Sequence, residues 1–265
     1  MALLSLLRKG AKIMVELNNG LYIAFEAVDG VGKTTQMRLL KEWLERVKHY
    51  TVFSTHEPGG TDCDIAEQIR SIILNPVNKA MAPETEALLF AASRAQAVNE
   101  VIKPHLANKE IVLSDRSLYS SLAYQAYGRG LNFYDVKRIN TFAVDTCKPD
   151  FVFYLHLPYD EIMKRKAERG QDIDRMEDVD KGFLLRTIQG FDTMAKSDSW
   201  VTIDASKDID ATQTTLRMLM RSILSLSKWK TSSRVKALAK APARTSKDYV
   251  HGTEGSYREE NIYDD

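Results

Sequence analysis

Segment 27–34 places a lysine and a threonine directly after two glycines, in the order Ala-Val-Asp-Gly-Val-Gly-Lys-Thr. Gly30 and Gly32 allow the backbone to approach an anion closely, because a Cβ at either position would block it. Backbone N–H groups that wrap onto a helix N-terminus form a nest for phosphate oxygens. We expect Lys33 to reach the β- and γ-phosphates of a triphosphate and the Thr34 hydroxyl to bind Mg²⁺.

This P-loop pattern departs from its usual form at the first position, where Ala27 replaces glycine. A methyl group is tolerated there if the backbone has a negative φ. The residues expected to bind the nucleoside triphosphate are Ala27, Val28, Asp29, Gly30, Val31, Gly32, Lys33, Thr34 and Thr35.

An acidic residue, Asp115, ends the apolar stretch 111–114. A carboxylate at the end of a strand beside a P-loop strand is suited to hold Mg²⁺, directly or through water. An ordinary helix N-cap is the alternative, and one residue could serve both roles. The predicted metal ligands are therefore Thr34 and Asp115.

Three further residues suit recognition of a nucleotide that accepts phosphate. Phe90 and Arg94 are four apart on a predicted helix and face the same way. Such a pair can stack on a flat base and bind a base carbonyl. Arg116 can bind a monophosphate through two hydrogen bonds. Taken singly, these residues could be a core aromatic, a surface arginine and a structural ion pair.

Strand-like and helical patterns alternate between about residues 19 and 227. Short apolar runs indicate strands at 21–25, 51–55, 111–114, 151–155 and 200–203. A first helix is indicated at 33–48, with Met37, Leu40, Leu44 and Val47 along one side. Helical patterns fill the other gaps at about 63–74, 84–106, 117–127, 133–146, 159–169, 179–195 and 208–226. The alternation predicts an α/β domain with a parallel sheet and helices on both faces. The loops that follow the strands then share one edge, where ligands bind.

The bulk composition is that of an ordinary globular protein. The 265 residues carry a formal net charge of +1, so no overall field would attract nucleic acid. Cys63 and Cys147 are far apart and fit neither a disulfide framework nor a zinc site, which favours the cytoplasm. The apolar run that ends at Leu7 is too short for secretion or for a membrane span, and basic residues follow it.

The two ends differ from the central domain in composition. Residues 1–18 are interpreted as an N-terminal extension. Segment 228–247 contains seven Lys or Arg and no acid, and 254–265 is acidic. A disordered tail at 228–265 is the expected state. A contact with nucleic acid through its basic part is the alternative.

Four motifs, in this order, resemble those of the thymidylate kinase family: Phe25–Gln36, Glu57–Thr61, Phe90–Arg94 and Asp115–Gln125. The resemblance extends over about residues 19–227. It implies Mg²⁺-dependent transfer of the ATP γ-phosphate to dTMP, giving dTDP for dTTP synthesis. It also implies the five-stranded P-loop nucleoside-monophosphate-kinase fold and a homodimer.

The resemblance also implies roles for individual residues. Asp29 would approach the deoxyribose 3′-OH, and Tyr124 would close the sugar pocket against a 2′-OH. Phe90 would stack on thymine, Arg94 would bind a base oxygen and Arg116 would hold the dTMP phosphate. The full set of expected substrate contacts is Asp29, Glu57, Pro58, Phe90, Arg94, Arg116, Ser120, Ser121, Tyr124 and Gln125.

A basic segment at 164–175 could form a lid over ATP. Phosphoryl transfer requires positive charge around the moving group. The resembled family supplies a catalytic arginine from the P-loop or from the lid, and Val31 leaves this role to the lid. Arg169, just before Gly170, is the first choice and Arg175 the second. A solvated basic helix end is the alternative. The predicted catalytic set is Asp29, Lys33, Arg116, Arg169 and Arg175.

Two other functions stay open at this point. His56 stands where the resembled bacterial pattern usually has arginine before Glu-Pro-Gly-Gly. This keeps open a kinase of another pyrimidine deoxynucleoside monophosphate, dUMP or 5-substituted dUMP, including a virus-encoded one. A non-catalytic nucleotide-binding protein is the third hypothesis, and the intact Lys33, Thr34 and Asp115 argue against it.

Overall fold

The computed structural model describes residues 20–169, 176, 180–197 and 199–226, with the backbone alone at 169, 225 and 226. The predicted extension at 1–18 and the predicted tail at 228–265 lie outside these residues. Among the described residues, no helix has the length and the continuous apolar surface that crossing a bilayer requires.

A single five-stranded sheet forms the centre of the domain, in the order β2-β3-β1-β4-β5. Every neighbouring pair is parallel. The strands are β1 (Leu21–Glu26), β2 (Val52–His56), β3 (Ile111–Asp115), β4 (Phe151–His156) and β5 (Trp200–Asp204). The predicted α/β architecture is confirmed, and each strand differs from its predicted bounds by one residue at most at either end.

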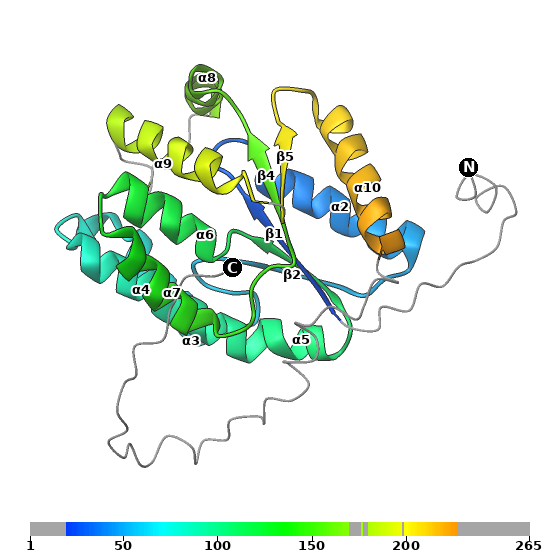
Figure 1. Cartoon of the computed structure of the whole chain (residues 1–265), viewed down its shortest axis with the longest axis horizontal. Helices are drawn as coiled ribbons and strands as arrows, with labels where there is room; N and C mark the ends of the chain where they lie inside the picture. Colours follow the sequence, from blue (N-terminus) through cyan, green and yellow to red (C-terminus); the bar gives the residue numbers. More distant parts are fainter. Residues whose placement is uncertain (1–19, 170–175, 177–179, 198, 227–265) are drawn as a thin grey trace, which may run out of the picture. The chain divides into compact units, whose positions relative to one another are not determined.

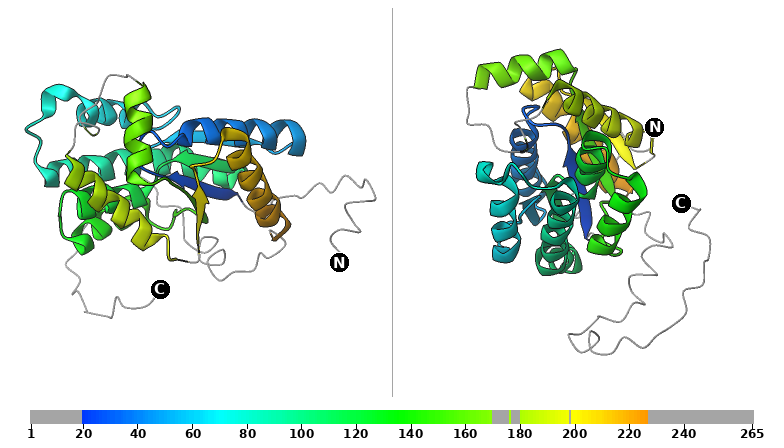
Figure 2. Two further views of the ribbon diagram at one scale, coloured as in Figure 1. Left: turned by 90° about the horizontal axis from the view of Figure 1, so that it is seen from above. Right: turned by 90° about the vertical axis from the view of Figure 1, so that its left-hand side faces the viewer.

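Helices connect the strands and cover both faces of the sheet, as Figure 1 and Figure 2 show. They are α2 (Lys33–Lys48), α3 (Asp64–Leu74), α4 (Pro83–Ala97), α5 (Lys103–Ala107), α6 (Leu118–Ser121), α7 (Phe133–Val144), α8 (Tyr159–Arg169), α9 (Lys181–Met194) and α10 (Ile209–Leu226). A short 3₁₀ helix, η1, spans Pro76–Asn78. Two π-helical segments, η2 (Val98–Ile102) and η3 (Leu122–Gly128), continue α4 and α6. They fall inside segments predicted as ordinary helices.

Helices α2 and α10 pack against each other on one face of the sheet. Met37, Leu40 and Leu44, on the apolar side of α2, are buried there. Val47 continues this side, but it is 56% exposed in the last turn of α2. Trp43 is buried instead, with 7% of its surface exposed. The apolar stripe of this helix therefore ends one turn earlier than the spacing predicts.

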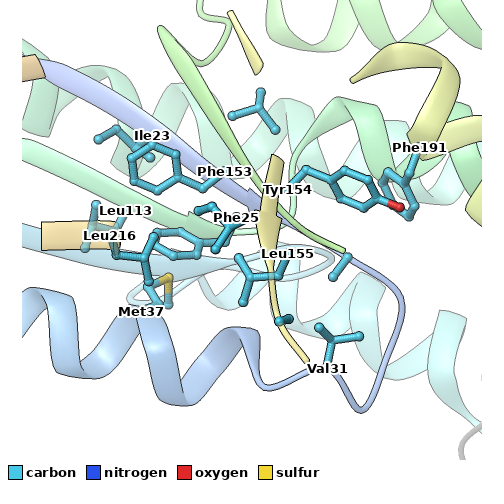
Figure 3. Close-up of a cluster of buried hydrophobic side chains, with 14 of the residues drawn as sticks. Ile23, Phe25, Val31, Met37, Leu113, Phe153, Tyr154, Leu155, Phe191 and Leu216 are labelled. Carbon is cyan, nitrogen blue, oxygen red and sulfur yellow. The ribbon is translucent and has the colours of Figure 1, made fainter. Parts of the chain in front are cut away.

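Side chains alternate between the two faces along the central strand, as the strand period requires. Ile23 and Phe25 belong to the core beneath α2, whereas Tyr22 belongs to the core on the opposite face with Val98 and Leu122. Figure 3 shows Phe25 close to Met37, Leu113 and Leu216. Both faces of the sheet are thus buried, which explains why the strands read as continuous apolar runs.

The register aligns the carboxyl ends of three neighbouring strands. Phe25 of β1 and His56 of β2 both pair with Asp115 of β3. Consequently the loop after β1, the loop after β2 and Asp115 open at one edge of the sheet. The predicted chemistry-bearing residues meet at this edge.

Candidate active site

The loop between β1 and α2 forms the predicted anion cradle. Gly30 and Gly32 have φ values of 88° and 98°, in the region that favours glycine. No heavy atom lies within 4 Å of the Cβ that another residue would place at 32. Backbone conformation, rather than packing, therefore requires glycine at this position.

Ala27 fits the loop because its backbone avoids the positive φ that would exclude a side chain. Its methyl group is fully buried in the core. Its carbonyl oxygen accepts a hydrogen bond from Nη1 of Arg116 at 3.0 Å. The departure from the usual glycine thus adds core packing and leaves the phosphate-facing backbone free.

The two predicted metal ligands lie together. Thr34 Oγ1 donates to Asp115 Oδ2 at 2.7 Å, across 81 positions of sequence. Lys33 Nζ is 3.8 Å from Asp115 Oδ1 and 3.7 Å from Asp29 Oδ1. Two hard oxygens beside a phosphate cradle suit Mg²⁺, which keeps several waters and takes substrate phosphates as further ligands. Within the described part of the chain, no group of three or more His, Cys, Asp or Glu could hold a metal without such help.

An ion-paired cluster joins the P-loop to the start of the segment after β3. Arg116 Nη2 donates to Asp29 Oδ1 at 2.5 Å and to the Tyr124 hydroxyl at 3.2 Å. The Tyr124 hydroxyl donates to Asp29 Oδ2 at 3.3 Å. Arg116 also lies 5.0 Å from the centre of the Tyr124 ring. These three predicted residues therefore act as one unit.

The charged form of Asp29 is strongly favoured in this cluster. Burial acts to raise the pKa of Asp29, but Arg116 and Lys33 outweigh it and hold that pKa well below its usual range. Asp29 is therefore a carboxylate throughout the neutral range. The backbone of Arg116 has φ 77°, an uncommon value for a residue with a side chain, and is held by a hydrogen bond from its N–H to Phe25 O.

A buried glutamate behind the cluster was not predicted from the sequence. Glu26 accepts hydrogen bonds from Ser117 at 2.7 Å and from Ser120 at 2.6 Å. The Ser120 hydroxyl also accepts from Arg116 Nη1 at 3.1 Å. Burial raises the pKa of Glu26 to about 7, although both serines act to lower it. An acid that ends an otherwise apolar strand is the signal that could have indicated it.

A cavity lies beside this cluster and gathers most of the predicted substrate contacts. Those that line it are Asp29, Glu57, Pro58, Phe90, Arg116, Ser120, Tyr124 and Gln125. Arg70, Leu74 and Met176 line it as well and were not predicted. Arg70 looked like an ordinary polar residue of an amphipathic helix, yet it donates to Pro58 O at 2.6 Å. We refer to this space as the base-side cavity.

Arg94 and Ser121 do not line the base-side cavity. Arg94 is 1% exposed and pairs with Glu57 at 2.6 Å. It also donates to Ser121 Oγ at 3.1 Å, to Ser117 O at 3.1 Å and to Asn140 Oδ1. The structure therefore shows Arg94 as the centre of a buried network that supports Glu57, and its contact with a base oxygen stays a prediction.

A larger cavity of about 740 Å³ contains the P-loop wall with Gly30, Gly32, Lys33 and Thr34. Its lining includes Asp29, Glu57, Arg70 and Arg116, which line the base-side cavity too. The two spaces therefore share a wall made of ionised side chains. We call the larger space the phosphate cavity.

A third cavity, of about 280 Å³, lies on the other side of the P-loop. Arg165 of α8 donates to Val31 O at 3.3 Å and to Ala205 O at 2.8 Å there. Its lining also contains Gln36 and Thr212. This space, which we call the donor-side cavity, is lined by residues of the P-loop, of α2, of α8 and of the segment after β5.

His56 takes part in a local hydrogen bond. Its Nε2 lies 2.7 Å from Glu67 Oε1, which also accepts from the Gly60 N–H at 2.9 Å. The ring lines the phosphate cavity and not the base-side cavity. His56 is the departure from the family pattern that left another acceptor nucleotide open. It therefore does not line the base-side cavity.

The predicted lid arginines stay predictions. Arg175 lies outside the described residues. Arg169 ends α8, but its side chain is outside the described part of the chain. Of the arginines in this segment, only Arg165 has a described side chain, and it binds backbone carbonyls.

Comparison with known proteins gives a consistent result. The family model described as thymidylate kinase matches residues 25–216. A thymidylate kinase of Exiguobacterium sibiricum is 43% identical over 199 residues, which cover 74% of this chain and 92% of that protein. One of Kosmotoga olearia is 45% identical over 179 residues, covering 67% and 83%. The crystal structure of a thymidylate kinase from Ehrlichia chaffeensis superposes with a TM-score of 0.59 at 30% identity, covering 76% of this chain and 98% of that one.

Proposed function

The chain belongs to the thymidylate kinase family, and we propose that its phosphate and base-side cavities carry out the reaction of that family. It is a nucleoside monophosphate kinase. The reaction is transfer of the γ-phosphate of ATP to dTMP, giving ADP and dTDP.

One observation carries the assignment of the two cavities. Asp29, Arg70 and Arg116 line both of them. An acceptor nucleotide in the base-side cavity would present its phosphate at this shared wall, next to the triphosphate on the P-loop. Such placement is what phosphoryl transfer needs most, since the protein contributes mainly alignment and positive charge.

The transfer step uses residues that line the phosphate cavity and the base-side cavity. An oxygen of the dTMP phosphate attacks the γ-phosphorus, and the bond from that phosphorus to the β,γ-bridging oxygen breaks. Lys33 binds the β- and γ-phosphates, and Arg116 holds the acceptor phosphate. Asp29 and the Tyr124 hydroxyl orient the deoxyribose. A lid arginine, Arg169 or Arg175, completes the positive charge.

Mg²⁺ would be held by Thr34 and Asp115, whose oxygens lie 2.7 Å apart. When bound, it neutralises charge on the β- and γ-phosphates. Lys33, within 4 Å of both Asp115 and Asp29, keeps these carboxylates oriented toward the phosphate cavity.

The donor-side cavity would take the adenine of ATP. Its lining supports this, because it joins Val31 of the P-loop to Arg165 and to the segment after β5, next to the phosphate cradle. The guanidinium of Arg165 offers a flat surface beside it, of the kind that stacks on a base.

A cytoplasmic homodimer is part of the proposal. Both cysteines, Cys63 and Cys147, are free and buried, which fits a reducing compartment. Helices α3, α4 and α7, each packed on the next, expose Ile65 and Ile72, Leu88, and Phe142 respectively. Such apolar side chains on adjacent helices suit an interface between two copies. Sedimentation of the purified protein at a monomer mass would contradict the dimer.

The function is tested with a panel of monophosphates, ATP and Mg²⁺, following ADP release. We expect the highest kcat/KM with dTMP. Higher turnover of dUMP or another 5-substituted dUMP would transfer the assignment to a different pyrimidine deoxynucleotide. ATP binding without turnover of any monophosphate would contradict an active kinase.

A further inference from the structure

The side-chain amide of Gln125 is bound on one side only. Its Nε2 donates to Glu86 Oε1 at 2.9 Å. Its Oε1 has no hydrogen-bond partner, although Gln125 is 0% exposed and lines the base-side cavity. A buried acceptor without a donor is unfavourable and calls for a partner from the ligand.

The orientation of the Gln125 amide is determined by the carboxylate of Glu86 that it faces. A carboxylate has no proton to donate, so only Nε2 of Gln125 can face Glu86. Arg129 pairs with Glu86 through a two-pronged contact, Nε to Oε1 at 3.2 Å and Nη2 to Oε2 at 3.0 Å, and an opposite charge at this distance favours the carboxylate form. Turning the amide over would bring two acceptors together beside a buried charge. Oε1 of Gln125 must therefore be the atom available to a ligand.

Helix geometry brings this acceptor next to the predicted stacking ring. Glu86 and Phe90 are four apart on α4, so they share one side of the helix. Gln125 and Arg129 are also four apart, at η3 and its C-cap, and both reach Glu86. The ring of Phe90 and the amide of Gln125 both line the base-side cavity. A base stacked on the Phe90 ring would present its hydrogen-bonding edge to the Gln125 amide.

We infer that Glu86 is a positioning residue for base specificity, which holds Gln125 so that Oε1 accepts a hydrogen bond from an N–H on the ring edge. Thymine and uracil carry such a proton at N3. Cytosine has a bare nitrogen there, which is itself an acceptor and would be repelled. This inference rests on the proposed function and goes beyond it, because it assigns the choice between these bases to a glutamate that does not line the cavity.

The test compares dTMP with 5-methyl-dCMP, which keeps the methyl group and differs at N3 and the 4-substituent. The readout is the ratio of the two kcat/KM values, with the KM for ATP measured alongside. In Glu86→Gln, the new amide can donate as well as accept, so Gln125 can turn over. We expect the ratio to fall by about 10- to 100-fold, through both a loss with dTMP and a gain with 5-methyl-dCMP. The KM for ATP should not change.

Two controls separate positioning from a general structural role. Glu84→Gln makes the same change at an exposed site of the same helix and should keep the wild-type ratio. Glu86→Asp keeps a side chain that can only accept, so it should restore most of the ratio even if the rate falls.

A Glu86→Gln enzyme with the wild-type ratio, whatever its absolute rate, would overturn the inference. If that variant does not fold, the wild-type enzyme still decides, because equal turnover of dTMP and 5-methyl-dCMP would also overturn it. A wild-type enzyme without dTMP turnover would instead refute the proposed function, and the inference with it.

Discussion

The acceptor side and the donor side of this site differ in the chemical groups that form them. The base-side cavity and the wall it shares with the phosphate cavity depend on ionised side chains that pair with one another, such as Arg116 with Asp29 and Arg94 with Glu57. At the donor-side cavity, by contrast, Arg165 donates to the backbone carbonyls of Val31 and Ala205 and not to a carboxylate. This difference indicates that selectivity for the acceptor nucleotide depends on paired side chains, whereas binding of the donor nucleotide depends on the backbone conformation of the P-loop.

The largest effect should follow from breaking the acceptor-side ion pair. In Arg116→Met, the phosphate contact is lost and Asp29 keeps a partly buried charge without its main partner. Truncating one member of a desolvated charge pair costs about 2–5 kcal/mol, so kcat/KM for dTMP should fall about 30- to 4,000-fold. The KM for ATP should change little. Steady-state kinetics with each substrate varied in turn measures both.

Arg38→Met is the control for this variant, because Arg38 is an exposed arginine of α2 that pairs with Glu42. It should behave as the wild type. An equal loss of dTMP and ATP affinity in Arg116→Met would remove the distinction between the two sides.

A second effect concerns the buried Glu26. Burial raises its pKa from 4.5 to about 7, so the folded protein holds a proton that the unfolded chain has lost. Stability from this group therefore falls as pH rises from about 4.5 to about 7 and changes no further above that. A glutamine at position 26 does not titrate, so the Glu26→Gln variant does not lose stability in this way as the pH rises. Its free energy of unfolding relative to wild type should rise by up to about 3 kcal/mol from pH 5 to pH 8.

Urea unfolding at the two pH values measures this difference. The same exchange at the exposed Glu84 should leave it unchanged between pH 5 and pH 8. A constant difference in Glu26→Gln would mean that Glu26 titrates in the folded protein as it does in the unfolded chain.

The smallest effect is expected on the donor side. Arg165→Met removes two hydrogen bonds to backbone carbonyls, but the cradle around Gly30 and Gly32 remains. We expect a rise of about 10-fold in the KM for ATP, with the KM for dTMP unchanged. Lys196→Met, at an exposed lysine just after α9, should have no effect. A fall in kcat/KM as large as that of Arg116→Met would contradict the contrast between the two sides.

The contrast also explains how much could be predicted from the sequence. The phosphate cradle is local, since its glycines, Lys33 and the following helix are adjacent in the chain, and its geometry follows from them. The five parallel strands were predicted for a similar reason, because each is a short apolar run between helical patterns. In both cases the information lies within a few neighbouring residues.

The partners of the acceptor side could not be predicted in this way. Arg116 pairs with a carboxylate 87 positions away, and Arg94 contacts Asn140 at a separation of 46. Residue types and helical spacing do not reveal which distant group a guanidinium will meet. The π-helical turn that carries Tyr124 and Gln125 was missed too, since its sequence looks like that of an ordinary helix. Arg70 was missed because nothing local separates it from a structural residue, whereas Glu26 carried a local signal, its place at the end of an apolar strand.

The pairing of Asp29 with Arg116 has a consequence for which anions can bind at the acceptor site. The guanidinium that would hold the dTMP phosphate already has an internal anion, so an incoming phosphate exchanges one counter-ion for another. A whole nucleotide can compensate the displaced Asp29 with its sugar hydroxyl, but inorganic phosphate cannot. The site should therefore resist inhibition by the free phosphate that surrounds it, and potent competition by millimolar phosphate against dTMP would contradict this.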